Sequence, residues 1–128
     1  FRDLVDGEGA FPSELLALIA FENLDALRLR ARGILDPNFR LLESFIEARP
    51  ELDWVRPRGG SVAFPRLRGA DDATPFTRLL RDRYETGVVP GRFFEAPEHF
   101  RVAVGGEREI LEGGLQRIGD ALDKEFSR

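Results

Sequence analysis

The sequence predicts an α/β (α+β) fold in which helices pack on one side of a short, largely antiparallel sheet. Apolar residues recur at helical spacing in four segments, which are delimited mainly by Pro and Gly. Short runs rich in Val and Phe lie between the later helical segments and have the composition of strands. The resulting order is two helices, a hairpin, a helix, two strands and a helix, which is typical of a small layered domain.

The first helix is predicted over residues 13–32, with Ser13 as its N-cap and Gly33 just beyond its end. At 100° per residue its apolar side chains form two stripes on roughly opposite sides, whereas a surface helix needs only one. We expect the domain to cover only one stripe by itself. One stripe consists of Leu16, Ala20, Leu24, Leu27 and Ala31, and the other of Leu15, Leu18, Ile19 and Leu29.

A second helix is predicted over residues 36–49, because Asp is a good cap, Pro is favoured at the first helical position and another Pro follows the segment. Residues 53–64 then predict a hairpin whose two strands are joined by the turn 57–60, which contains Pro and two Gly residues. The polar segment 65–73 is expected to be a connection without regular structure.

The third helix is predicted to begin at Thr74 and to stop at Gly87. Two further strands are predicted, over residues 88–89 and 100–104. The last helix follows a Gly-Gly pair and runs to about residue 126, with apolar residues at helical spacing along its inner side. These inner residues are Leu111, Leu115, Ile118, Leu122 and Phe126.

Length and composition indicate one soluble globular domain. The chain has 128 residues, of which 42% are hydrophobic and 33% charged, and this balance is ordinary for a folded protein. A net charge of −4 argues against nonspecific binding of nucleic acid. The longest apolar run, residues 15–21, is too short to cross a bilayer, and no signal peptide opens the chain. We therefore expect a cytoplasmic protein without nucleic-acid or membrane partners.

Two residue types are absent, and lysine occurs only once. Without cysteine, the chain can form no disulfide, thiolate metal site or cysteine nucleophile. Because it begins at Phe1 and contains no methionine, we expect it to be a piece of a longer protein. Of its 19 Lys and Arg residues only Lys124 is a lysine, a bias that we interpret as codon usage in a GC-rich genome.

Arg101 is the most unusual residue of the predicted strands. Phe100, Val102 and Val104 alternate toward one face, so Arg101 and the small Ala103 point to the other. One interpretation is an edge-strand arginine that reaches solvent or pairs with a nearby glutamate. The other is an arginine that rigid neighbours hold in place to bind a carboxylate or phosphate through two hydrogen bonds. The residues alone leave both open.

The other candidate residues do not complete a catalytic set. His99, the single histidine, has no acidic or nucleophilic partner at a known spacing and is expected to be a surface residue. The pairs 59–60 and 105–106 match no phosphate-binding glycine loop. Lys124 lies on the side of its helix opposite Leu115 and is expected to face water. From these residues we expect a soluble domain with one notable arginine and no metal site.

Four ordered motifs nevertheless resemble a known family. They are Asp-Pro-Asn at 36–38, Trp-Val followed by Pro-x-Gly-Gly-x-x-x-Phe within 54–64, Gly-Val-Val-Pro-Gly-x-x-Phe at 87–94, and Phe-Arg-Val-Ala-Val-Gly at 100–105. In this order and at these spacings, the set is similar to the C-terminal small domain of the class I/II aminotransferases, pyridoxal-phosphate (PLP) enzymes of fold type I. The resemblance covers roughly residues 13–126.

The resemblance implies specific roles. In the family, the arginine of the strand that follows the Pro-Gly-x-x-Phe turn binds the substrate α-carboxylate, and this role falls on Arg101. Pro90, Gly91 and Phe94 would form the pocket wall. The lysine that carries PLP, the acidic partner of the pyridine nitrogen and the phosphate-binding groups belong to the large domain. The resemblance therefore implies that this piece contains no catalytic or cofactor-binding residue and is inactive alone.

For the whole protein, the resemblance implies a homodimeric aminotransferase of amino-acid metabolism that acts on amino acids and 2-oxo acids. Residues 1–12 would be a lead-in, 13–32 an interdomain helix and 33–128 the core of the small domain, with the missing large domain as partner. Two alternatives remain: the aminotransferase-like effector-binding domain of a transcriptional regulator, or a stand-alone module that binds small carboxylates through Arg101.

Overall fold

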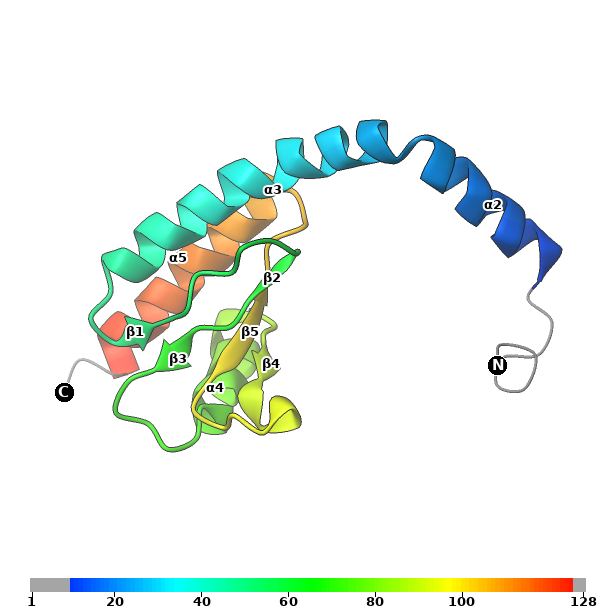
Figure 1. Ribbon diagram of the computed structural model, residues 1–128. Helices are drawn as coiled ribbons and strands as arrows, with labels where there is room; N and C mark the ends of the chain where they lie inside the picture. The colour runs from blue at the N-terminus through cyan, green and yellow to red at the C-terminus, as the bar shows by residue number, and fades with distance from the viewer. Residues whose placement is uncertain (1–9, 126–128) are drawn as a thin grey trace. The chain divides into compact units, whose positions relative to one another are not determined.

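The computed structural model describes residues 10–125 and divides the chain into two compact units, Phe1–Gly33 and Ile34–Arg128. Unit 1 contains helix α2 (Phe11–Glu22) and the first part of helix α3 (Leu24–Glu47). Unit 2 contains the rest of α3 and all the remaining helices and strands (Figure 1). Within residues 10–125, no helix has both the length and the apolar character that a membrane span requires.

The predicted ends of the first two helices are wrong. The chain is predicted to break at Gly33, but it breaks at Asn23 and then continues as one helix through Pro37. The Asn23 side chain donates a 2.8 Å hydrogen bond to the carbonyl of Ile19, and asparagine competes with helical backbone in this way. Pro37 lacks an N–H group and so removes one helical hydrogen bond. Packing offsets this loss, because Leu42 and Ile46 of the same helix are buried in the core.

Asn38, the residue after this proline, connects α3 to the rest of unit 2. It is 1% exposed, and its Nδ2 donates hydrogen bonds of 2.8 Å to the carbonyl of Val104 and 3.0 Å to that of Gly106. Buried polar groups of this kind need such partners, since an unpaired one costs about 1–3 kcal/mol. Val104 directly follows the strand that contains Arg101, and Gly106 lies just beyond it.

The strands of unit 2 form two small antiparallel sheets. Strand β5 (Phe100–Ala103) lies in the middle of the three-stranded sheet, between β2 (Val62–Ala63) and β4 (Val89–Pro90). Val62 faces Ala103 across the first pair, and Val89 faces Arg101 across the second. The second sheet pairs β1 (Leu52–Asp53) with β3 (Arg66–Leu67). The predicted antiparallel character is confirmed.

The predicted hairpin over residues 53–64 is wrong. Its first strand does not continue past Asp53, and Val55 is 91% exposed. The chain instead places Leu52 opposite Leu67, and both are buried, so the segment predicted as a connection supplies β3. Burial of this apolar pair accounts for the pairing, because an exposed strand without apolar cross-strand contacts gains little from forming a sheet.

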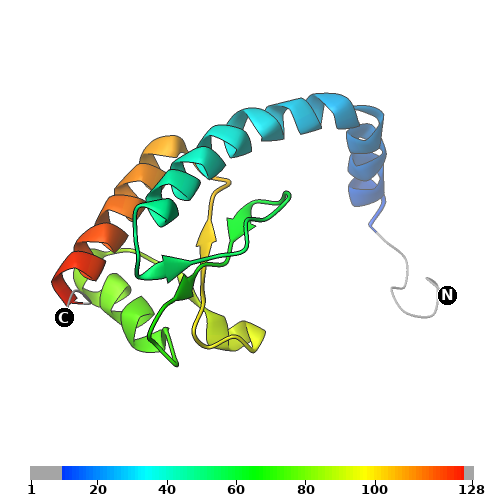
Figure 2. The same cartoon turned by 60° about the vertical axis from the view of Figure 1, so that its left-hand side comes forward.

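The core lies between the three-stranded sheet and the helices of unit 2. Helix α4 (Thr74–Tyr84) places Phe76 against Phe100, with ring centroids 5.8 Å apart. Helix α5 (Arg108–Glu125) lies beside the unit 2 part of α3 (Figures 1 and 2). Four of the five predicted inner residues of the last helix are buried, and Phe126 lies outside the described residues. The four are Leu111, Leu115, Ile118 and Leu122. The helices therefore cover the face of β5 that carries Phe100 and leave the opposite face accessible.

Candidate functional site

The candidate site lies on the face of the three-stranded sheet that points away from the core. Phe100 and Val102 are 1% and 6% exposed on the core side, whereas Arg101 is half-buried and Ala103 is exposed on the other side. This is the predicted alternation. The interpretation of Arg101 as an edge-strand residue is wrong, because β5 is the central strand and has a hydrogen-bonded neighbour on each side.

The guanidinium of Arg101 lies over an aromatic ring. Its Cζ is 5.0 Å from the centroid of Phe94, a cation–π distance. Within residues 10–125, no carboxylate forms an ion pair with Arg101. A ring contact does not neutralise charge, so the guanidinium keeps its full positive charge and can bind an anion.

Two further rings support Phe94. Phe64, which follows β2, meets Phe94 edge-on at 5.6 Å, and His99 stacks on Phe64 at 4.8 Å with an interplanar angle of 14°. His99 is therefore partly buried rather than the surface residue that was predicted. Its Nδ1 is buried without a hydrogen-bond partner among the described residues; Glu98 Oε1 lies 3.5 Å away without hydrogen-bond geometry.

A tight turn brings Phe94 to this position. Residues Gly91–Phe94 form a short 3-10 helix, η1, directly after β4. The N–H of Gly91 donates a 2.8 Å hydrogen bond to the carbonyl of His99, and its carbonyl accepts one of 3.2 Å from Ala96. A side chain at Gly91 would overlap both the Ala96 and the His99 carbonyl oxygens. Only glycine allows the backbone to approach the start of β5 this closely.

The structure thus brings Arg101 and Phe94 together and places Pro90 and Gly91 in the turn that leads to them. Sequence reasoning missed Phe64 and His99. The spacing of two between His99 and Arg101 would place both on one strand face. The position of Phe64 could not be predicted in the same way, because it depends on the long-range pairing of β2 with β5.

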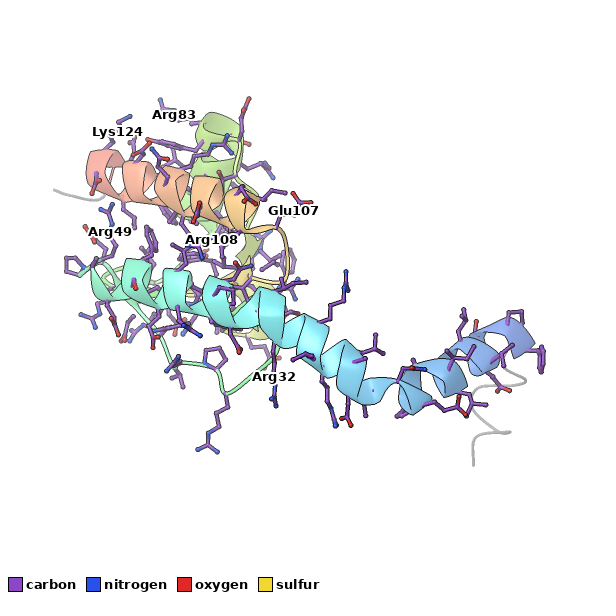
Figure 3. The ribbon with its side chains drawn as sticks, turned by 90° about the horizontal axis from the view of Figure 1, so that it is seen from above. Arg32, Arg49, Arg83, Glu107, Arg108 and Lys124 are labelled. Carbon is purple, nitrogen blue, oxygen red and sulfur yellow. The ribbon has the colours of Figure 1, made fainter. Side chains whose placement is uncertain are left out.

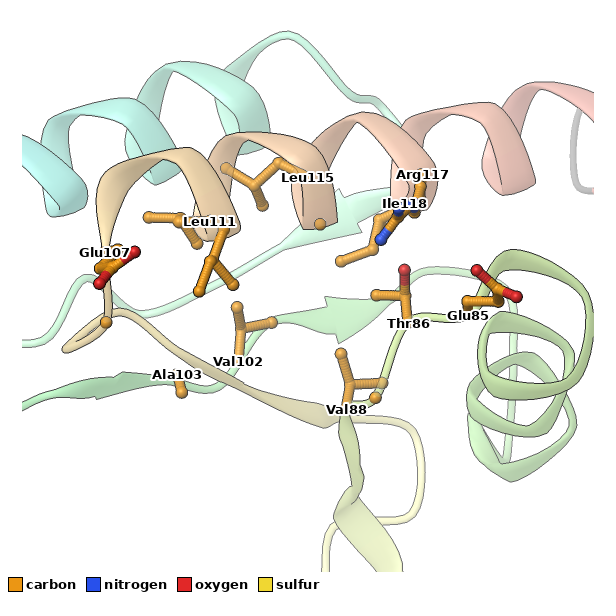
Figure 4. Close-up of a pocket in the computed structure, with 14 residues that line it drawn as sticks. Glu85, Thr86, Val88, Val102, Ala103, Glu107, Leu111, Leu115, Arg117 and Ile118 are labelled. Atoms are coloured by element: carbon orange, nitrogen blue, oxygen red, sulfur yellow. The ribbon is translucent and has the colours of Figure 1, made fainter.

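A separate cavity of about 260 Å³ lies on the core side of the sheet, below α5 (Figure 4). Its wall is mainly apolar and includes Val88, Val102 and Leu111, with Glu107 and Arg117 also among its lining residues. None of the predicted site residues lines it. The arginine site is therefore separate from this cavity.

Lys124 is exposed near the C-terminal end of α5 (Figure 3). In the part of the chain that the structure describes, no three His, Asp or Glu side chains cluster in a way that could hold a metal ion. The site can therefore bind an anion through Arg101 and present aromatic surface beside it.

Known proteins share this fold and part of this sequence. No family model matches the sequence. Capreomycidine synthase of Streptomyces vinaceus is 34% identical over 110 residues, which cover 85% of this chain and 28% of that protein. A PLP-dependent aminotransferase from Streptococcus suis 89-1591 superposes with a TM-score of 0.86 at 26% identity, over 96% of this chain and 33% of the other.

Aminotransferases recur among the homologues and structural neighbours; aspartate aminotransferase of Bacillus subtilis (strain 168), for example, is 27% identical over 81 residues, which cover 59% of this chain and 21% of that protein. The chain also superposes on the PLP-dependent cyclase OrfR with a TM-score of 0.85 at 28% identity. The match covers 96% of this chain and 34% of the cyclase. These matches confirm the predicted fold class. The chain spans at most about a third of the length of these relatives.

Proposed function

We propose that this chain is the C-terminal small domain of a PLP-dependent aminotransferase that moves amino groups between amino acids and 2-oxo acids. In this proposal Arg101 binds the α-carboxylate of the substrate, and Pro90, Gly91 and Phe94 form part of the pocket wall. The observation that carries the proposal is the guanidinium on the central strand, held over Phe94 and without an ion pair among residues 10–125.

A guanidinium in this position suits a carboxylate. Its planar fork can donate two parallel hydrogen bonds to the two oxygens, which a lysine ammonium cannot reproduce. The strand neighbours Phe100 and Val102 are packed in the core, so the backbone of Arg101 is fixed before a ligand arrives. Less conformational freedom is then lost on binding.

PLP would supply the electron sink that amino transfer requires. The residues of this chain do not fit that cofactor, because its single lysine is exposed on α5 and no anion-binding glycine loop is present in the sequence. We therefore assign PLP and its lysine to a large domain outside residues 1–128. We propose that the chain alone is inactive, and that the whole protein is a cytoplasmic homodimer.

The test is Arg101→Lys in the whole protein, assayed in both half-reactions. A charged hydrogen bond contributes about 1.5–3 kcal/mol, so KM for the amino acid and for the 2-oxo acid should rise about 10-fold to 100-fold. Because the carboxylate is bound before and during the reaction, kcat should change less. The matched control is Arg92→Lys, since Arg92 also lies over a phenylalanine, with its Cζ 4.9 Å from the Phe93 ring.

Unchanged KM values in Arg101→Lys would leave Arg101 as a solvent-facing arginine and would refute its assignment. The same assay on the 128-residue chain with added PLP should yield no product, and turnover there would refute the proposed inactivity. A whole protein that binds amino acids through Arg101 but catalyses no transfer would instead favour an effector-binding or carboxylate-binding module.

A further inference from the structure

Four side chains form a continuous series on the accessible face of the sheet. His99 stacks on Phe64 at 4.8 Å, Phe64 meets Phe94 at 5.6 Å, and Arg101 lies over Phe94 at 5.0 Å. We call these residues the aromatic series. Arg101 is the last member of the series. Each ring therefore limits the movement of the next ring, and the Phe94 ring limits the movement of the Arg101 side chain.

Backbone hydrogen bonds hold the three segments that contribute the aromatic series. The N–H of Phe100 donates to the carbonyl of Pro65 at 3.0 Å, which joins the segment of Phe64 to the start of β5. The N–H of Gly91 donates to the carbonyl of His99, which joins the turn before Phe94 to the same place. The rings are therefore attached to a common frame rather than to independent loops.

A second arginine–phenylalanine pair in the same turn lacks this support. Arg92 lies over Phe93 at a similar distance, but Phe93 is more exposed than Phe94 (65% against 45%) and contacts no other ring among the described residues. Arg92 and Phe93 are sequence neighbours on an exposed turn, whereas Arg101 and Phe94 come from different elements. The contact between Arg92 and Phe93 is therefore incidental, whereas the fold brings Arg101 and Phe94 together.

We propose that Phe94 is a positioning residue for Arg101, and that Phe64 and His99 hold its ring in place. This inference rests on the proposed function of Arg101. An arginine side chain has several rotatable bonds, and the freedom that it loses on binding weakens affinity. The Phe94 ring removes part of this freedom in advance, so the fork already lies where a carboxylate can meet it.

The kinetic test is Phe94→Leu in the whole protein, which keeps an apolar side chain but removes the ring. KM for both substrates should rise about threefold to tenfold, the range expected from loss of a cation–π contact, with kcat little changed. Phe94→Tyr retains the ring and should restore the normal KM. Phe93→Leu, which removes the ring under Arg92, should have no effect.

The second readout is the reaction rate of individual arginines with phenylglyoxal, measured by peptide mass spectrometry. Phe94→Leu should increase labelling of Arg101 severalfold and leave Arg92 unchanged. Phe93→Leu should change the labelling of neither arginine, because the contact between Arg92 and Phe93 is incidental. Phe64→Leu, which removes the ring that supports Phe94, should also increase labelling of Arg101 and provides a second variant should Phe94→Leu not fold.

The two proposals fail in different ways. If Arg101→Lys leaves KM unchanged, the proposed function fails whatever happens at Phe94. If Arg101→Lys raises KM but Phe94→Leu changes neither KM nor the labelling of Arg101, the positioning role is refuted and the proposed function stands. Equal labelling of Arg101 in wild type, Phe94→Leu and Phe64→Leu would likewise overturn the inference.

Discussion

The absence of a Cβ atom at Gly91 allows the close backbone packing near Arg101. Its backbone φ is not positive, so conformational freedom does not explain the glycine; positive φ among the glycines occurs at Gly60 and Gly69. The reason is steric, because a Cβ would overlap the carbonyls of Ala96 and His99. Gly91→Ala is expected to destabilise the domain by about 1–3 kcal/mol, the range for overpacking at a tight site.

Urea unfolding would measure this change. The control is Gly59→Ala, because a Cβ there meets no atom within 4 Å, and its stability should stay within about 0.5 kcal/mol of wild type. Equal stabilities of the two variants would show that the turn can relax, and that the close approach at Gly91 is not required.

At the same scale, the sequence predicts the orientation of Arg101 but not its surroundings. Strand alternation is a local property, so the burial of Phe100 and Val102 already places Arg101 on the opposite face. The contacts of Phe64 depend on which strands pair. The predicted hairpin pairs the segment of β2 with the residues just before it. In the structure β2 pairs with β5, which lies about 40 residues further along the chain, and no local signal favours this distant partner.

Helix α4 carries a pH-sensitive contact at its start. The pKa of Asp72 is held below its usual value of 3.8, first by the Thr74 hydroxyl and then by the Thr74 N–H, with smaller effects of Arg92 and Arg78. Of the two Thr74 groups only the N–H has hydrogen-bond geometry, at 2.7 Å. We therefore attribute most of the effect to this N–H, which the start of a helix leaves without a helical partner.

Because the folded-state pKa is lowered, the ionised carboxylate stabilises the fold above the unfolded-state pKa, and this contribution is lost as pH falls through the folded-state value. Asp72→Ala should lower Tm at neutral pH, and the difference from wild type should vanish in acid below the folded-state pKa. Thermal melts across this range provide the measurement. Asp71→Ala is the neighbouring control, and a Tm difference for Asp72→Ala that persists in acid would contradict the explanation.

The helices show which features of secondary structure could be predicted from the sequence and which could not. The start of α4 and the inner side of α5 were predicted, because caps and apolar spacing are local signals. The continuity of α3 through Gly33 and Pro37 was not, since Gly33 favours the end of one helix and Pro37 the start of another. Burial of Leu42 and Ile46 outweighs that preference, and burial is a property of the folded unit.

For the molecule as a whole, the expectation that the domain covers one of the two apolar stripes of residues 13–32 is wrong, because residues of both stripes are exposed. Leu16 is 67% exposed on one stripe, and Leu18 and Leu29 are 56% and 74% exposed on the other. Contiguous apolar surface of more than a few hundred Å² is uncommon on soluble monomers. We therefore expect the 128-residue chain to self-associate at micromolar concentration.

Sedimentation would test this expectation, with residues 34–128 as the control, because this span keeps the core that Leu42 and Ile46 complete. The control should sediment as a folded monomer. If the 128-residue chain is also monomeric, the exposed stripes do not drive association. In that case the apolar pattern of unit 1 would need another explanation.

Asn38 has a mechanical consequence for the site. Its two hydrogen bonds, to Val104 and Gly106, attach the unit 2 part of α3 to the end of the strand that contains Arg101. The attachment is buried and short, so this part of the helix and the strand cannot slide past each other without breaking it. A displacement of this part of α3 would therefore break both hydrogen bonds unless the end of the strand, close in sequence to Arg101, moved with it.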